Sequence, residues 1–167
     1  MHRSPYASAA TAIGLAIAAD ESSGFELVDR FSRTFGVFRE GKDGAQVIFD
    51  PIFTRDLRLP SAPDQPFVSC RMYRPAHNIG HFRYIECASL DSNGSPDGDI
   101  MPFADVLFPF DPALRSNGTD LRTVPVERTL SEGHVMQERY ALDSHGIVEV
   151  TITDMDAGFE SVHKLSS

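Results

Sequence analysis

Hydrophobic and polar positions alternate over most of the chain, which is the pattern of strands with one face buried. The alternating runs recur at short intervals from residue 31 to the C-terminal end, and turn residues separate them. This spacing predicts a mainly β fold, an antiparallel sandwich or barrel of eight or nine strands, and we favour a sandwich of about eight. The predicted strands are residues 31–37, 45–54, 68–72, 81–88, 135–142, 147–153 and 159–165, with shorter candidates at 106–108 and 124–126.

Turn residues place the connections between these strands. The stretches 40–44 and 91–99 are polar and rich in Gly, so we expect loops there, and Pro51 should break or bend the second strand. The sharpest hairpin pattern is Asp143-Ser144-His145-Gly146 between two alternating runs. Gly146 is therefore predicted to have a positive φ.

In the N-terminal segment the apolar residues recur at helical spacing instead of alternating. An apolar stripe of Ala9, Ile13, Ala16 and Ile17 predicts a helix over residues 4–19, with Ser4 as N-cap and a stop at 22–24. The same segment can be interpreted as a secretory signal, because a basic residue precedes a stretch of small apolar residues. That stretch is mostly Ala, so we favour the helix.

Composition narrows the classes of function. The chain has 167 residues, enough for one domain with a core that needs no disulfide or metal. Its 15 Lys and Arg against 24 Asp and Glu give a net charge of −9, which argues against binding to nucleic acid or to anionic membrane surfaces. No apolar run has the length of a membrane span. We expect a globular cytoplasmic protein.

Two pairs of residues suggest chemistry, but each has a simpler interpretation. His77 and His81 are four residues apart, a spacing that suits a metal on a helix, yet they lie in a turn leading into a strand. Asp143 and His145 resemble a catalytic pair, yet they lie in the predicted tight turn. We therefore predict no metal site, no catalytic residue and no enzymatic activity.

The two cysteines and the two Asn-X-Ser/Thr triplets are also given structural interpretations. Cys70 and Cys87 fall in strand patterns and are expected to be buried free thiols. The triplets at 93–95 and 117–119 match the glycosylation pattern, but we interpret them as turns because no convincing secretory signal is present.

Read in order, several short motifs resemble the seventy-kilodalton heat-shock chaperones, the DnaK family. Residues 8–19 resemble the last helix of that family's nucleotide-binding domain, and Leu27-Val28-Asp29 resembles its interdomain linker. Further resemblances to its substrate-binding sandwich are Phe35-Gly36-Val37, Leu59-Pro60, Ile79-Gly80-His81-Phe82 and the 143–150 hairpin.

The resemblance implies a domain division and a function. Residues 1–24 would be a remnant of an upstream nucleotide-binding domain, 25–29 the linker, and 30–167 the sandwich. The sandwich would bind unfolded or extended peptides, with Phe35 and Val37 lining the pocket. ATP and magnesium would belong to the upstream domain alone, and the N-terminal helix, separated from that domain, is expected to mediate self-association.

The chain also departs from the family pattern. It has too few residues between Pro60 and Phe67 for the family's third strand, no helical lid, and a charged 40–44 loop where peptide-binding chaperones place an apolar arch. These departures support an alternative, an interaction or scaffold sandwich that has lost peptide binding. A filled or charged space beside Phe35 would favour this alternative, and an exposed apolar groove would favour the chaperone.

Overall fold

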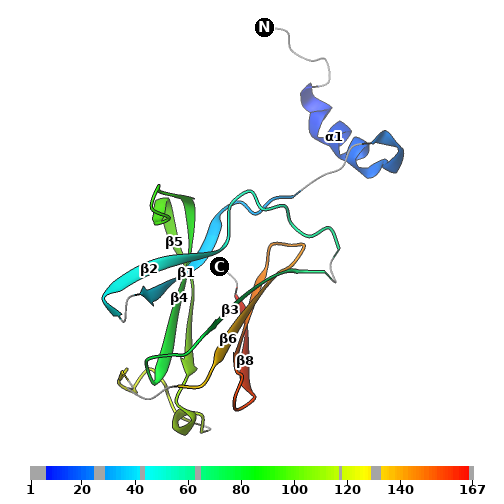
Figure 1. Ribbon diagram of the computed structural model, residues 1–167. Helices are drawn as coiled ribbons and strands as arrows, with labels where there is room; N and C mark the ends of the chain where they lie inside the picture. Colours follow the sequence, from blue (N-terminus) through cyan, green and yellow to red (C-terminus); the bar gives the residue numbers. More distant parts are fainter. Residues whose placement is uncertain are drawn as a thin grey trace.

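The computed structural model describes residues 7–24, 29–41, 44–62, 65–116, 118–128 and 133–165. Two antiparallel sheets of four strands face each other, and one helix stands apart from them (Figure 1). The prediction of a mainly β sandwich with an N-terminal helix is confirmed. Among the described residues, no helix has the length and apolar character needed to cross a membrane.

The first sheet has the strand order β2-β1-β4-β5 and the second β3-β6-β7-β8. The chain passes from one sheet to the other between β2 and β3, between β3 and β4, and between β5 and β6. The strand bounds are β1 Thr34–Gly41, β2 Gln46–Phe53, β3 Phe67–Tyr73, β4 Ile79–Leu90, β5 Pro96–Pro109, β6 Met136–Leu142, β7 Val148–Asp154 and β8 Phe159–Leu165.

A single core lies between the two sheets, and aromatic rings from both sheets meet in it. Phe35 of β1 contacts Tyr84 of β4 and Tyr140 of β6 at centroid distances of 5.5 and 6.4 Å. The second sheet contributes Met136, Tyr140, Leu142, Val148, Val150 and Ile152, all fully buried. Along β7 buried side chains alternate with exposed or half-buried ones, as the sequence pattern predicted.

The C-terminal hairpin agrees with its prediction. β6 and β7 pair from Met136↔Asp154 to Leu142↔Val148, and Gly146 in the turn has a φ of 79°. Asp143 Oδ1 accepts hydrogen bonds from the N–H groups of His145 and Ile147, so this carboxylate holds the turn.

The region around β5 corrects two predictions. Residues 96–99 were expected to lie in a loop, but β5 begins at Pro96 and runs to Pro109. The strand lies at a sheet edge, where a Pro that lacks an N–H costs no ladder bond, and two register shifts opposite β4 absorb its irregularities. The strand candidate at 124–126 is wrong, since Pro125 O and the backbone of Glu127 are hydrogen-bonded to Asn78 instead of to a sheet.

The burial predicted for Cys70 is also wrong, whereas that of Cys87 is confirmed. Both thiols are free, but Cys70 is exposed on β3. The strand turns Arg71 and Tyr73 inward, where Arg71 pairs with Asp50 of β2. The outward face therefore carries Val68, Cys70 and Met72.

The N-terminal segment forms a short 3-10 turn at Ala7–Ala9 followed by α1, Ala10–Ala19. The predicted cap at Ser4 lies outside the described residues. A second 3-10 turn, Glu21–Ser23, and a left-handed Gly24 end the segment. No residue of α1 is buried, and Ile13 and Ile17 of the predicted stripe are exposed.

Candidate functional site

A groove of about 540 Å³ opens at the end of the sandwich where β1 and β4 separate. The two strands pair only from Thr34↔Cys87 to Val37↔Tyr84. Beyond that point β1 continues beside β2 alone, and the first part of β4 lies beside β5 alone. Residues 38–41 of β1 and 79–83 of β4 thus form the two arms of a fork.

The floor of the groove is apolar. Ile79 and Phe82 at the start of β4 are buried, and the Phe110 ring lies 6.2 Å from that of Phe82. Gly80 makes room for this arrangement, because a Cβ atom there would lie 2.6 Å from the Phe110 ring. The Tyr73 ring, from the opposite sheet, packs edge-on against Phe110 at 6.2 Å.

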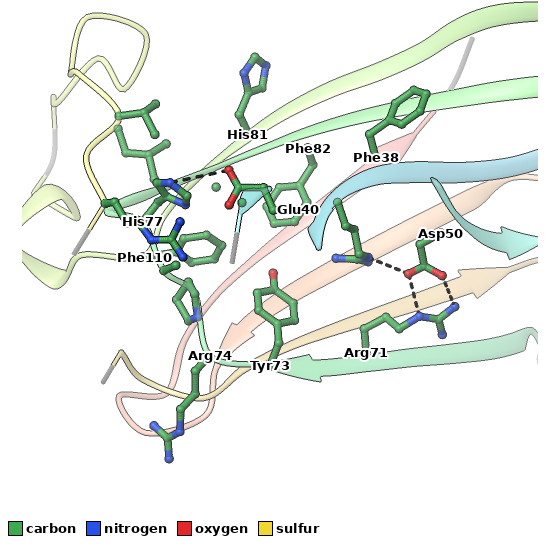
Figure 2. A pocket seen from close by; sticks show the side chains of 18 of the residues that line it. Phe38, Glu40, Asp50, Arg71, Tyr73, Arg74, His77, His81, Phe82 and Phe110 are labelled. Carbon is green, nitrogen blue, oxygen red and sulfur yellow. Dashed lines mark hydrogen bonds and ion pairs between the residues drawn. The ribbon is translucent and has the colours of Figure 1, made fainter. Parts of the chain in front are cut away.

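The rim of the groove is polar and carries both signs of charge. Figure 2 shows the His77–Glu40 pair at one end and the Asp50–Arg71 pair at the other, with Tyr73 between them. His77 Nε2 is 3.8 Å from Glu40 Oε1. Arg74 is exposed and donates to the carbonyl oxygen of Gly133 at 2.6 Å.

Asn78 holds one wall of the groove in place. Its side chain donates to Pro125 O at 3.0 Å and accepts from the Glu127 N–H at 2.8 Å. The segment that contains Val126 and Arg128 is therefore held against the start of β4, where both residues line the groove. The sequence prediction missed Asn78 because a single Asn in a loop has no distinguishing pattern.

Charged side chains along the groove tie the two sheets together. Arg39 of β1 donates to Asp50 at 2.7 Å and to both carboxylate oxygens of Glu138 of β6, at 3.0 and 2.6 Å. Arg71 of β3 donates to the same Asp50 at 2.8 and 2.9 Å, and Tyr140 donates to Glu138. The positive charges of two guanidinium groups thus lie beside two carboxylate groups.

Burial and pairing shift the pKa values of this network in opposite senses. Burial disfavours the charged guanidinium of Arg39, but the hydrogen bond and charge of Glu138 outweigh it and raise its pKa. Burial also opposes the charge of Asp50, yet the hydrogen bonds from Arg71 and Arg39 leave its pKa lowered. Burial, together with the Glu138 charge, raises the pKa of Tyr73. Arg39, Arg71 and Asp50 are therefore ionised at neutral pH.

The residues implied by the resemblance lie elsewhere. Phe35 and Val37 are fully buried in the core and do not line the groove. Their role in peptide binding stays a prediction, since either side chain would reach a peptide only if the core opened. Leu27 and Val28 of the expected linker lie outside the described residues. Asp29 is exposed, and its backbone carbonyl oxygen accepts a hydrogen bond from the Leu59 N–H at 2.9 Å.

Candidate metal ligands are also separated. His77 and His81 point to different acids, Glu40 and Asp105. Among the described residues, His134, Asp154 and Asp156 lie close enough to share an ion. However, the Asp154 oxygens already accept from Arg115, His134 and the N–H groups of residues 156 and 157. Asp154 is thus a buried anchor whose neighbouring cation would repel a metal ion.

No family model matches the chain, and no curated protein matches its sequence.

Proposed function

We propose that the domain is a non-enzymatic binding module whose groove takes an extended segment of polypeptide. The observation that carries this proposal is the fork, where residues 38–41 and 79–83 each have one partner strand. Backbone N–H and C=O groups point alternately to the two sides of a strand. Some of these groups in each arm therefore point into the fork, where they have no partner strand. An extended segment entering there gains main-chain hydrogen bonds, which is the general mode of strand addition.

The side chains of the groove supply a second source of affinity. Alternate side chains of an extended segment point to opposite faces, so every second one points to the floor of Ile79, Phe82 and Phe110. Apolar side chains fit this floor. The intervening side chains reach the rim, where Glu40 and Arg74 give the groove both signs of charge.

Within this function, we propose the peptide-binding domain of a DnaK-like chaperone as one candidate. It would act in the cytoplasm on unfolded segments, and ATP and magnesium would belong to an upstream nucleotide-binding domain. The two-sheet sandwich and the partly apolar groove support this candidate. The second candidate is an interaction or scaffold module with a dedicated partner segment. The filled space around Phe35 and Val37 supports the second candidate.

Fluorescence anisotropy with labelled heptapeptides tests the groove. The matched variants are Phe38→Ala, which removes an aromatic ring from the rim, and Phe67→Ala on β3, outside the groove. The two rings are equally exposed, at 40% and 43%. We expect Phe38→Ala to weaken binding several-fold and Phe67→Ala to leave it unchanged. Equal effects of the two variants would place the peptide elsewhere.

The range of peptides bound separates the two candidates. Binding of several unrelated Leu-rich heptapeptides supports the chaperone. No binding of any of them at millimolar concentration, which corresponds to about −4 kcal/mol, supports the scaffold module.

A further inference from the structure

The four edge strands of the sandwich differ in how they are protected against pairing with another chain. β2 contains Pro51 and a register shift, and β5 contains Pro96, Pro102 and two register shifts. β8 carries exposed Glu160 and Lys164. Prolines, irregularities and charges of this kind are the usual devices that prevent edge-to-edge association.

β3 is the least protected of the four edge strands. It contains neither Pro nor Lys, and it pairs with β6 in unbroken register from Phe67↔Leu142 to Tyr73↔Met136. Its one device of this kind is an inward-pointing charge, Arg71, which pairs with Asp50. Its outward face exposes Val68, Cys70 and Met72, with Val68 48% and Met72 62% exposed. An edge with an unbroken ladder and an apolar outward face is therefore left open among the described residues.

The sequence of β3 is also symmetric in residue type about its centre. Reading outward from Cys70, the pairs are Ser69 with Arg71, Val68 with Met72, and Phe67 with Tyr73. An antiparallel pair of two such strands related by a two-fold axis at Cys70 places polar beside polar, aliphatic beside aliphatic and aromatic beside aromatic. An interface of this kind is isologous, because the same residues serve on both sides.

We propose that β3 pairs with β3 of a second copy of this chain, antiparallel and centred on Cys70, to join the two second sheets into one continuous sheet of eight strands. We identify the partner as a second copy because, in this register, each residue of β3 lies beside a residue of the same type in the other copy. The interface lies on β3 and does not use α1.

A charge-exchange experiment tests the register. In the proposed dimer, Val68 of one copy lies beside Met72 of the other, so each substitution acts twice. Sedimentation velocity of the full chain over a concentration series should show a dimer that Val68→Lys or Met72→Glu alone weakens by about tenfold. The double variant V68K/M72E should recover the affinity, because each Lys then faces a Glu of the other copy. A monomeric wild-type chain, or a dimer that the single variants leave unchanged, would overturn the proposal.

A disulfide provides a second readout. Directly opposed residues of antiparallel strands have Cα atoms about 4.5–5.5 Å apart, a separation that a disulfide spans. Oxidised glutathione, which accepts the two protons and two electrons of the two thiols, should link wild-type chains through Cys70. Cys87→Ser should behave as wild type, and Cys70→Ser should stay unlinked. A wild-type dimer that forms no disulfide would disprove the axis at Cys70.

The helix supplies the remaining control. The double variant I13K/I17K places charges on the exposed face of α1 in the full chain. The I13K/I17K variant should dimerise with the same affinity as wild type. Loss of the dimer in I13K/I17K, with the β3 variants still dimeric, would assign the association to the helix and overturn the β3 interface.

Discussion

Arg39 and Glu138 meet across the space between the two sheets, with Arg39 Nη2 2.6 Å from Glu138 Oε2. The Glu138 side chain is fully buried, and it accepts from Tyr140 as well. Burying a carboxylate is costly unless its oxygens are paired and hydrogen-bonded, and here both oxygens are. The pair therefore fixes the position of β1 relative to β6 at the inner end of the groove.

The first prediction concerns this pair. Glu138→Gln removes the negative charge and leaves the Arg39 guanidinium partly buried, so the free energy of unfolding should fall by about 3 kcal/mol. Urea denaturation measures the loss. The control, Glu149→Gln, alters an exposed side chain on β7 and should change the stability by less than about 0.5 kcal/mol. Equal effects would mean that the Arg39–Glu138 pair is not held as described.

The second prediction concerns acid stability. Burial alone would raise the pKa of Asp154, but hydrogen bonds from His134, the Ala157 N–H and Arg115 lower it to about 2. A lowered pKa stabilises the fold above the unfolded-state value near 3.8, and this contribution disappears as the pH falls towards 2. Wild type should exceed Asp154→Asn by about 2 kcal/mol at pH 6.

Urea denaturation at a series of pH values tests this difference. The advantage of wild type should shrink between about pH 5 and pH 2, where the carboxylate takes up its proton. Arg115→Gln, which removes the cation, should narrow the same pH-dependent difference. A difference between wild type and Asp154→Asn that does not vary with pH would contradict the assigned ion pair.

The third prediction concerns the 143–146 turn. Gly146→Val should lower the free energy of unfolding by more than about 1 kcal/mol, because a β-branched residue resists a φ of 79°. Gly146→Asn is the control, since Asn tolerates the left-handed region and should cost less. Thermal denaturation compares the two variants. An unchanged midpoint for the Val variant would contradict the positive φ at Gly146.

The fourth prediction concerns packing on the outer face of β1. A Cβ atom at Gly36 would lie 2.5 Å from Asp50 O and 2.5 Å from the Phe49 ring. Gly36→Ala should therefore destabilise the sandwich by about 1–3 kcal/mol. The matched variant Gly14→Ala has no heavy atom within 4 Å of its Cβ and lies in α1, so it should not lower the midpoint of urea unfolding. If Gly36→Ala leaves the stability unchanged, β2 can move away from the added Cβ atom.

The fold was predictable from the sequence wherever one strand face is plainly apolar. More and less buried side chains alternate along most of β6, β7 and β8, and the predicted bounds of these strands agree with the structure to within about one residue. β5 was not predictable in this way, since its register shifts and Pro residues interrupt the alternation. For β3 the pattern predicted the strand but not its inward face, because the Arg71–Asp50 ion pair decides which face turns inward.

The groove was less predictable than the fold. It depends on where β1 stops pairing with β4, and pairing between strands far apart in the sequence leaves no local pattern. One signal was present: Arg39 and Glu138 occupy inward positions in runs that otherwise place apolar side chains inward. A charge at such a position predicts a buried partner. The partner itself, almost a hundred residues away, is set by how the sheets stack.

The short junction between β1 and β4 has a mechanical consequence. Beyond Val37 no ladder joins the β1–β2 hairpin to β4, and among the ion pairs that hold the hairpin to the rest of the sandwich are Arg39–Glu138, Asp50–Arg71 and His77–Glu40. Because no ladder crosses the fork, its width can change without breaking a backbone hydrogen bond between β1 and β4. Amide protons of residues 38–41 should therefore exchange faster than those of 34–37, and a segment bound in the fork should slow them first.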